Sequence, residues 1–250
     1  MIWRDLLLVV VAFAAGAQNA LAGGGSFLTF PALLFAGLDP RAANITSTIA
    51  LFPGQVTTGL AGRNLVTGAA GLGFAVLFWL SLVGGALGAV LLLVTPPGVF
   101  ARMVPYLVLF ATAVFAWGSF GRRPAGEGIT ARLGVSGAMV AQFMISIYGG
   151  YFGGGIGILM LAALTAAGIA VRHAGATKNV LAGVMNASAV VVFMFDARIA
   201  WSLVLYVAVA AIAGGQLGVF LLRRINEKVL KGGIVVIGLA LTIGLFIEMP

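Results

Sequence analysis

The sequence predicts an all-α polytopic membrane protein made of two inverted repeats, each a glycine-broken helical hairpin plus three transmembrane helices. Of its 250 residues, 62% are hydrophobic and 8% are charged, and the mean hydropathy is +1.16, whereas soluble domains are far less apolar. Apolar runs close to the roughly 20 residues that cross a bilayer recur along the chain. A triple glycine occurs twice, at 23–25 and at 153–155. Together these features predict one integral membrane domain.

The first repeat, residues 1–121, contains a helix that a triple glycine interrupts. Glycine ends an apolar helix because it adopts positive φ and adds backbone entropy where another residue would continue the helix. The apolar piece after the break, at 27–38, is too short to span a bilayer comfortably. Long helices are expected at 6–22, 43–62, 71–94 and 103–120.

A polar connection at 122–132 separates the repeats and is expected in the cytoplasm. The second repeat, residues 133–250, follows the same plan, with a triple glycine after its first helix. Its helices are expected at 133–150, 156–168, 174–195, 199–222 and 229–247.

The start of the chain has a second interpretation. A short charged segment, an apolar stretch and Ala20-Leu21-Ala22 imitate a secretory signal peptide with its cleavage site. Cleavage there would remove the first helix of the repeat. We therefore expect this segment to be retained.

The two halves match at the level of individual residues. GGALGAVLL at 84–92 reappears as GGQLGVFLL at 214–222, about 130 positions later, and the triple glycines share that displacement. The long helices after the two breaks align with one extra residue, which places Gln55 on Asn186. Paired repeats of this kind place a binding site at their interface. The glycine pairs with small-xxx-small spacing are assigned to close helix packing; they are Gly84 with Gly88 and Gly214 with Gly218.

Lysine and arginine are unevenly divided between the two sides of the expected membrane. One side holds Arg63, Arg122, Arg123, Arg132, Arg172, Arg223, Arg224, Lys228 and Lys231, and the other holds Arg4, Arg41, Arg102 and Arg198. Cytoplasmic loops carry the positive excess, so both termini are expected outside the cytoplasm. Each half makes an odd number of net crossings, which inverts the second repeat. Topology thus explains the net charge of +8, and we expect no nucleic-acid partner.

Two stripes of polar residues follow the glycine breaks. Asn44, Thr48 and Gln55 share one helix face, and Asn179 and Asn186 share the equivalent face of the second half. Buried amides need hydrogen-bond partners, which are a neighbouring helix, water or a ligand. Interhelical contact remains open for each residue alone. The matching of the two stripes favours a ligand site, in which Gln55 and Asn186 approach each other.

Several cationic residues lie at the start of the second stripe. Lys178 either extends to the cytoplasmic interface or points inward beside Asn179 to contact substrate. Arg172 and its repeat mate Arg41 are expected to anchor the membrane interface, with gating as a secondary role. His173 is the only histidine and is given a secondary gating or proton role. One imidazole without cysteine builds no metal site, and no metal or cofactor is expected.

The acidic residues all lie at expected segment ends or in loops. Carboxylate relays of pumps and acid rings of cation channels therefore have no candidates at mid-membrane. Helix N-termini, amide donors and one lysine instead describe a site for an oxyanion. An enzyme is not expected, because too few acid and base groups are available.

The segments GGGSFLTFPALLFAGLDPRAANITSTIALFPGQ, GGYFGGGIGILMLAAL and RHAGATKNVLAGVMNAS resemble the two repeat signatures of the TauE/SafE family of membrane permeases. The resemblance covers nearly the whole chain. It implies transport of sulfite or an organosulfonate across the bacterial inner membrane. The expected substrate-binding residues are Gly23, Gly24, Gly25, Ser26, Asn44, Thr46, Ser47, Gln55, Gly153, Gly154, Gly155, Thr177, Lys178, Asn179 and Asn186.

The function expected is secondary transport of small sulfur-containing anions by alternating access, with export favoured. An inside-negative potential drives anions outward without a coupling ion. An anion channel and an uptake permease for another small organic anion remain as alternatives. The expected partners are the anion and the lipid bilayer, and a homodimer is left open.

Overall fold

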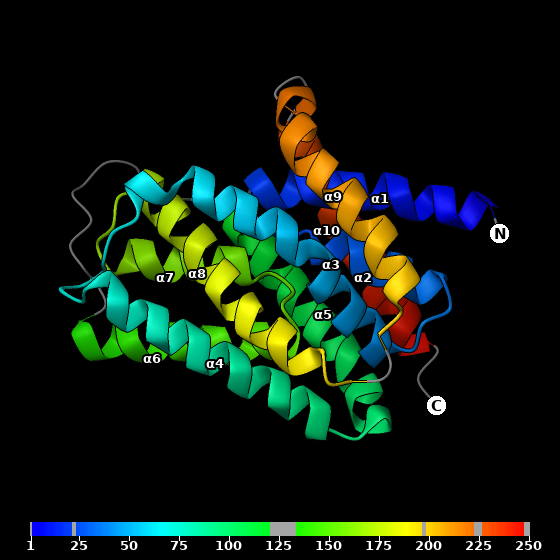
Figure 1. Cartoon of the computed structure of the whole chain (residues 1–250), viewed down its shortest axis with the longest axis horizontal. Helices are drawn as coiled ribbons and strands as arrows, with labels where there is room; N and C mark the ends of the chain where they lie inside the picture. The colour runs from blue at the N-terminus through cyan, green and yellow to red at the C-terminus, as the bar shows by residue number, and fades with distance from the viewer. Residues whose placement is uncertain (1, 22–23, 121–133, 197–198, 223–226, 248–250) are drawn as a thin grey trace.

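The computed structural model describes residues 2–21, 24–120, 134–196, 199–222 and 227–247 (Figure 1). These residues form α-helices and one 3-10 turn, with no β-strand among them, which confirms the predicted all-α fold. The predicted connection at 122–132 lies outside the described residues. The elements are α1 (Ile2–Leu21), α2 (Ser26–Phe35), α3 (Pro40–Ala61), η1 (Arg63–Leu65), α4 (Phe74–Val94), α5 (Pro97–Phe120), α6 (Val135–Tyr151), α7 (Ile156–Ala166), α8 (Val171–Phe193), α9 (Trp201–Leu222) and α10 (Glu227–Ile247).

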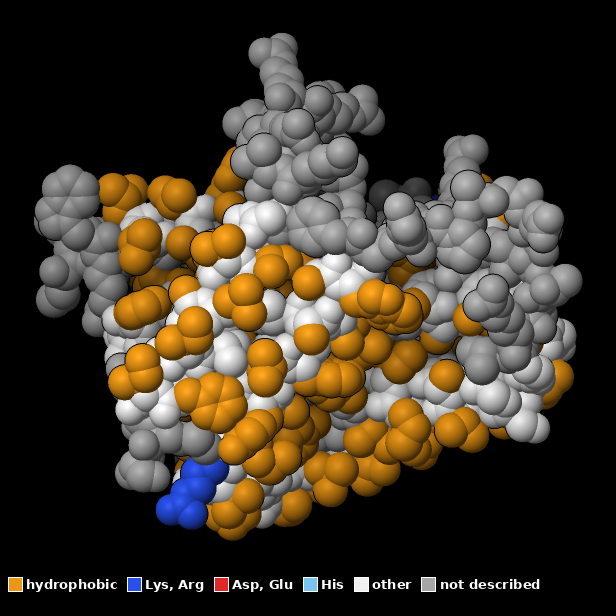
Figure 2. Space-filling model, turned by 180° about the vertical axis from the view of Figure 1, so that it is seen from behind, with side chains coloured by type: hydrophobic (Ala, Val, Ile, Leu, Met, Phe, Trp, Pro, Cys, Tyr) orange, Lys and Arg blue, Asp and Glu red, His pale blue; other side chains and the backbone are white. Residues whose placement is uncertain are grey.

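By length and composition, three of the described helices can cross a membrane, and they lie at Phe74–Val94, Pro97–Trp117 and His173–Phe193. The short helices α2 and α7 have 10 and 11 residues. At about 1.5 Å per residue they reach roughly half of a 30 Å hydrocarbon core. Hydrophobic side chains also cover much of the described surface in Figure 2. An apolar surface of this extent suits a lipid environment.

Both expected glycine breaks are present, one between α1 and α2 and one between α6 and α7. Gly24, Gly153 and Gly155 have φ of +86°, +81° and +73°, a conformation that other residues adopt only with strain. The breaks are not identical copies. Gly25 has a right-handed φ of −55° before α2, whereas its counterpart Gly155 is left-handed before α7.

Helices α1–α5 of the first half correspond in order to α6–α10 of the second half. Most contacts between the halves have an equivalent contact in which each helix is replaced by its counterpart. Helix α1 packs on α9 and α6 packs on α4, while α3 packs on α9 and α8 on α4. Likewise α2 contacts α10 and α7 contacts α5. Two further pairs, α3 with α8 and α5 with α10, join equivalent helices. The helices of the two halves therefore pack in closely similar ways.

Helices α3 and α8 lie side by side and run in opposite directions (Figure 1). Gly62, at the C-terminal end of α3, lies against Ala176, near the start of α8. Gln55, earlier on α3, is hydrogen-bonded to Asn186, later on α8. Gln55 and Asn186 are equivalent residues of the two halves. Equivalent positions of the two halves therefore meet between α3 and α8.

Glycine allows close backbone approach where α4 meets α6 and where α1 meets α9. A Cβ on Gly88 would overlap the carbonyl oxygen of Ile147, and one on Gly214 would overlap that of Phe13. A Cβ on Gly84 would lie 2.7 Å from the Cβ of Ser146. The predicted packing role is confirmed at these three glycines, since only glycine fits such contacts. Gly218 lies among residues whose side chains are not described.

Candidate functional site

A cavity lies where α3, α8 and the two glycine breaks meet. It offers about 40 Å³ to the centres of water-sized molecules. One water needs roughly 10–15 Å³, so the cavity has room for a few waters or one small solute. Its lining residues are Asn19, Gly24, Ser26, Thr48, Leu51, Gln55, Thr58, Phe152, Gly153, Ile156, Gly157, Lys178, Asn179, Ala182 and Asn186.

Both halves of the chain contribute residues to the wall of the cavity. Three of its lining pairs are repeat equivalents on α3 and α8. Each half therefore contributes one wall, which is the interface position predicted from the sequence. The pairs are Thr48 with Asn179, Leu51 with Ala182, and Gln55 with Asn186.

The predicted approach of Gln55 and Asn186 is confirmed. The Nδ2 group of Asn186 donates to Oε1 of Gln55 at 2.5 Å. Among the described residues, the Gln55 amide nitrogen has no protein acceptor, so its N–H groups remain available at the cavity wall. The pair thus joins the halves and still offers donors to a solute.

Lys178 contributes the cation of this cavity. Only 5% of the residue is exposed, and it lines the cavity, which favours the inward-pointing alternative over extension to the cytoplasmic interface. Within the described part of the chain, no hydrogen bond or ion pair engages its ammonium. The repeat mate Ser47 is buried and hydrogen-bonded to Thr29 at 2.6 Å. The positive charge is therefore one-sided.

Protein groups already satisfy part of the backbone freed at the breaks. Oδ1 of Asn19 accepts the Gly25 N–H at 3.4 Å, and Nδ2 of Asn44 donates to the Tyr151 carbonyl at 3.1 Å. The hydroxyl of Tyr148 donates to the Gly154 carbonyl at 2.8 Å. These contacts hold the breaks in place and leave fewer backbone groups for a ligand than the glycine clusters suggest.

Seven of the predicted substrate-binding residues line the cavity: Gly24, Ser26, Gln55, Gly153, Lys178, Asn179 and Asn186. Seven others do not: Gly25, Asn44, Thr46, Ser47, Gly154, Gly155 and Thr177. Protein contacts explain most of this second group. For example, the Thr177 hydroxyl accepts the backbone N–H of Thr67 at 3.0 Å, and Thr46 is fully buried. Gly23 lies outside the described residues.

The structure adds lining residues that the sequence did not single out. Asn19 lies about one helical turn before the first glycine cluster, and Thr58 lies three residues after Gln55. Helical spacing contained a signal for Thr58, because residues three apart share a helix face. Phe152 also lines the cavity, although its aromatic side chain gave no polar signal.

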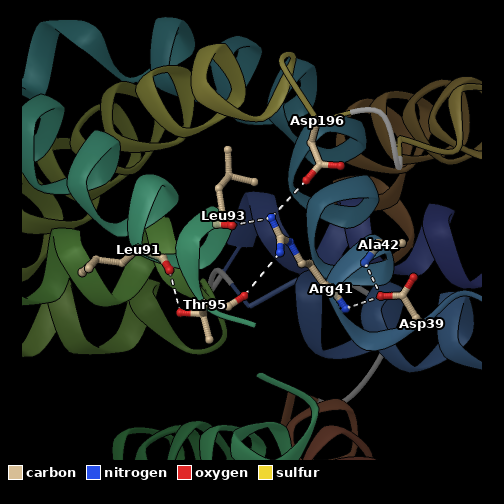
Figure 3. Close-up of polar contacts among 7 residues, drawn as sticks. All are labelled: Asp39, Arg41, Ala42, Leu91, Leu93, Thr95 and Asp196. Carbon is tan, nitrogen blue, oxygen red and sulfur yellow. Dashed lines mark hydrogen bonds and ion pairs between the residues drawn. The ribbon is translucent and has the colours of Figure 1, made fainter. Parts of the chain in front are cut away.

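Arg41 is not the exposed interfacial anchor that we expected. Only 6% of it is exposed, and its guanidinium donates to Asp196 Oδ2 at 3.2 Å and to the Leu93 carbonyl at 2.7 Å (Figure 3). The Arg172 side chain is not described. His173 is half-buried and does not line the cavity.

No carboxylate is among the cavity-lining residues. Asp39 instead caps the N-terminus of α3, and Asp196 lies just after α8. No cluster of histidine and acidic residues suited to a metal ion occurs within the described ranges. The chemistry of the cavity is thus one ammonium group with amide and hydroxyl groups, beside an apolar wall.

Apolar helices of membrane-spanning length, packed around a polar cavity, characterise a helical membrane protein. The chain belongs to the TauE/SafE family, since the family model described as "Sulfite exporter TauE/SafE" matches residues 8–245. It is accordingly a membrane transporter by family.

Relatives with similar sequence support this assignment. A "Probable membrane transporter protein ORF9" of Sinorhizobium sp. is 31% identical over 247 residues, covering 96% of this chain and 92% of the relative. A "Probable membrane transporter protein" of Haemophilus influenzae is 28% identical over 244 residues, covering 95% and 93%. The "Probable membrane transporter protein YfcA" of Escherichia coli (strain K12) is 27% identical over 237 residues, covering 92% and 85%. No solved structure matches the chain.

Proposed function

We propose that the protein is a secondary transporter of small sulfur-containing anions, sulfite or an organosulfonate, and that it binds them in the cavity between α3 and α8. The observation that carries this proposal is Lys178, a buried cation without a partner among the described residues, in a cavity whose described lining includes no carboxylate. The family description names sulfite export.

A buried ammonium is costly unless a counter-charge and hydrogen-bond acceptors surround it. An anion in the cavity supplies both. Its oxygens accept from Lys178 and from the side-chain amides of Gln55 and Asn179, which line the same space. Hydrogen bonds between charged groups are stronger than neutral ones. A cationic solute would meet Lys178 with no acid to offset the repulsion.

Alternating access is the mechanism that suits a cavity lined by equivalent helices of two similar halves. Opening one end and then the other exchanges the roles of two similar halves around a fixed site. The opposite directions of α3 and α8 support inverted repeats. The family resemblance implies a bacterial inner-membrane location, and the distribution of lysine and arginine favours both termini on its periplasmic side.

Export is the favoured direction of transport. A charge that crosses 100 mV gains about 2.3 kcal/mol, so a dianion that leaves an inside-negative cell gains about 4.6 kcal/mol without a coupling ion. The cavity offers no carboxylate that would relay protons or bind sodium.

Proteoliposomes loaded with sulfite test this function. We expect sulfite efflux to accelerate when the potential is set inside-negative, with no proton or sodium gradient, and to saturate with concentration. Liposomes containing Lys178→Gln protein serve as the matched control. Uphill sulfite uptake driven by a proton or sodium gradient would contradict export. Single-channel currents would instead identify an anion channel.

A further inference from the structure

A buried cluster of polar groups joins three helix ends beyond one end of the cavity (Figure 3). Nη2 of Arg41, in the first turn of α3, donates to Asp196 Oδ2 at 3.2 Å and to the Leu93 carbonyl at 2.7 Å. Its Nη1 donates to the Thr95 carbonyl at 3.3 Å. Leu93 and Thr95 lie at the end of α4, and Asp196 lies just after α8. One guanidinium therefore ties together α3, α4 and α8.

Arg41 of this cluster lies on the same helix, α3, as several residues that line the cavity. Arg41 precedes the lining residue Thr48 by seven positions, or about 10 Å along α3 at 1.5 Å per residue. At the opposite end, Arg172 is the repeat equivalent of Arg41. The positions equivalent to Asp39 and Asp196 there hold Ala170 and Leu65. Neither Asp39 nor Asp196 therefore has an acidic residue at its equivalent position.

Equivalent residues also differ in exposure between the two ends. Thr58, toward the C-terminal end of α3, is half-buried and lines the cavity, whereas its repeat mate Ala189 is fully buried beside Phe193 in the core. Space around Gly175 is open enough that an added Cβ would touch nothing within 4 Å. Its mate Asn44 is 3% exposed and hydrogen-bonded. The end that holds Arg41 is closed, and the other end is more open.

We propose that the Arg41–Asp196 ion pair is the latch that closes this end, and that it parts when the cavity opens there. Separation of α3 from the end of α8 must break this ion pair, because its two side chains lie on the two elements that move apart. Ala189 would then become accessible, as Thr58 is in the present state. The proposal concerns the walls of the cavity and does not depend on which solute occupies it.

Cysteine labelling tests the latch, because the chain contains no cysteine of its own. We would introduce Ala189→Cys and measure its reaction with a charged, water-soluble maleimide in purified full-length protein without added anion. Asp196→Asn is expected to accelerate labelling by at least about tenfold, since it removes the negative charge that faces the buried Arg41 guanidinium and so weakens their hydrogen bond. Thr58→Cys, at the open end, should not gain reactivity from the same change.

Asp39→Asn is the matched control at the same end. Asp39 accepts only the backbone N–H groups of Arg41 and Ala42 among its described hydrogen bonds, and asparagine is an equally good helix cap. Unchanged Ala189→Cys labelling with Asp196→Asn would overturn the latch, and so would an equal increase with Asp39→Asn. If Asp196→Asn protein does not fold, Arg41→Lys provides a second test, because lysine keeps the charge but loses the forked contacts of the guanidinium. Arg41→Lys should accelerate labelling of Ala189→Cys in the same way. Slow labelling in the Arg41→Lys protein would also overturn the proposal.

Discussion

Replacing Lys178 with glutamine is expected to weaken sulfite binding by about 30-fold or more and, at the same time, to stabilise the empty protein. Loss of one partner from a buried charge pair costs about 2 kcal/mol or more, and 1.4 kcal/mol is a factor of ten in affinity. The empty protein gains because glutamine removes a buried ammonium that has no partner within the described part of the chain. Thermal unfolding of the purified protein over a sulfite titration measures both effects.

The opposite signs of these two effects separate a binding lysine from a structural one. Loss of a structural lysine would lower the melting temperature of the empty protein. Ser47→Ala is the control, because Ser47 is the repeat mate and lies outside the cavity, hydrogen-bonded to Thr29. It should lower stability and leave the sulfite-induced shift intact. An unchanged shift in folded Lys178→Gln protein would remove Lys178 from the site.

Gly88→Ala is expected to destabilise the protein by about 1–3 kcal/mol, the usual cost of overpacking. The added Cβ would overlap the Ile147 carbonyl oxygen and lie 2.8 Å from the Tyr151 nitrogen. Both atoms belong to the backbone of α6, so no side-chain rotation relieves the clash. Reversible unfolding in detergent, followed by circular dichroism, measures the loss.

Gly183→Ala provides the comparison for Gly88→Ala. Gly183 is also helical, but a Cβ there meets nothing within 4 Å. Alanine lowers backbone entropy in the unfolded chain, so we expect a gain of about 0.5–1 kcal/mol. Equal effects of the two substitutions would show that the contact between α4 and α6 is not close-packed.

Apolar run length was sufficient to predict the helices, because each buried or lipid-facing segment must satisfy its backbone internally. The starts of α3 and α5 were placed too late. Each helix begins at a proline, Pro40 and Pro97, and proline suits the first helical turn because its missing N–H is not needed there. Hydropathy alone does not show that a proline marks the first turn of a helix.

Helical periodicity and the internal repeat predicted the central contact of Gln55 with Asn186. They did not separate residues that face the cavity from residues that hold the breaks. Asn44 lies on the predicted stripe, yet its partner is the Tyr151 carbonyl, 107 positions away. Arg41 was misplaced for the same reason, because its partner Asp196 is 155 positions away. Such contacts depend on tertiary packing, which local spacing does not contain.

The central claim is that an anion binds beside Lys178 in the cavity between α3 and α8. Crystals of the full-length protein grown with selenite, a heavier analogue of sulfite, test it most directly through the anomalous scattering of selenium. We predict a selenium peak in the cavity within contact of Lys178 and of the Gln55–Asn186 pair. A well-ordered cavity without selenium, while selenite occupies another part of the protein, would contradict the account.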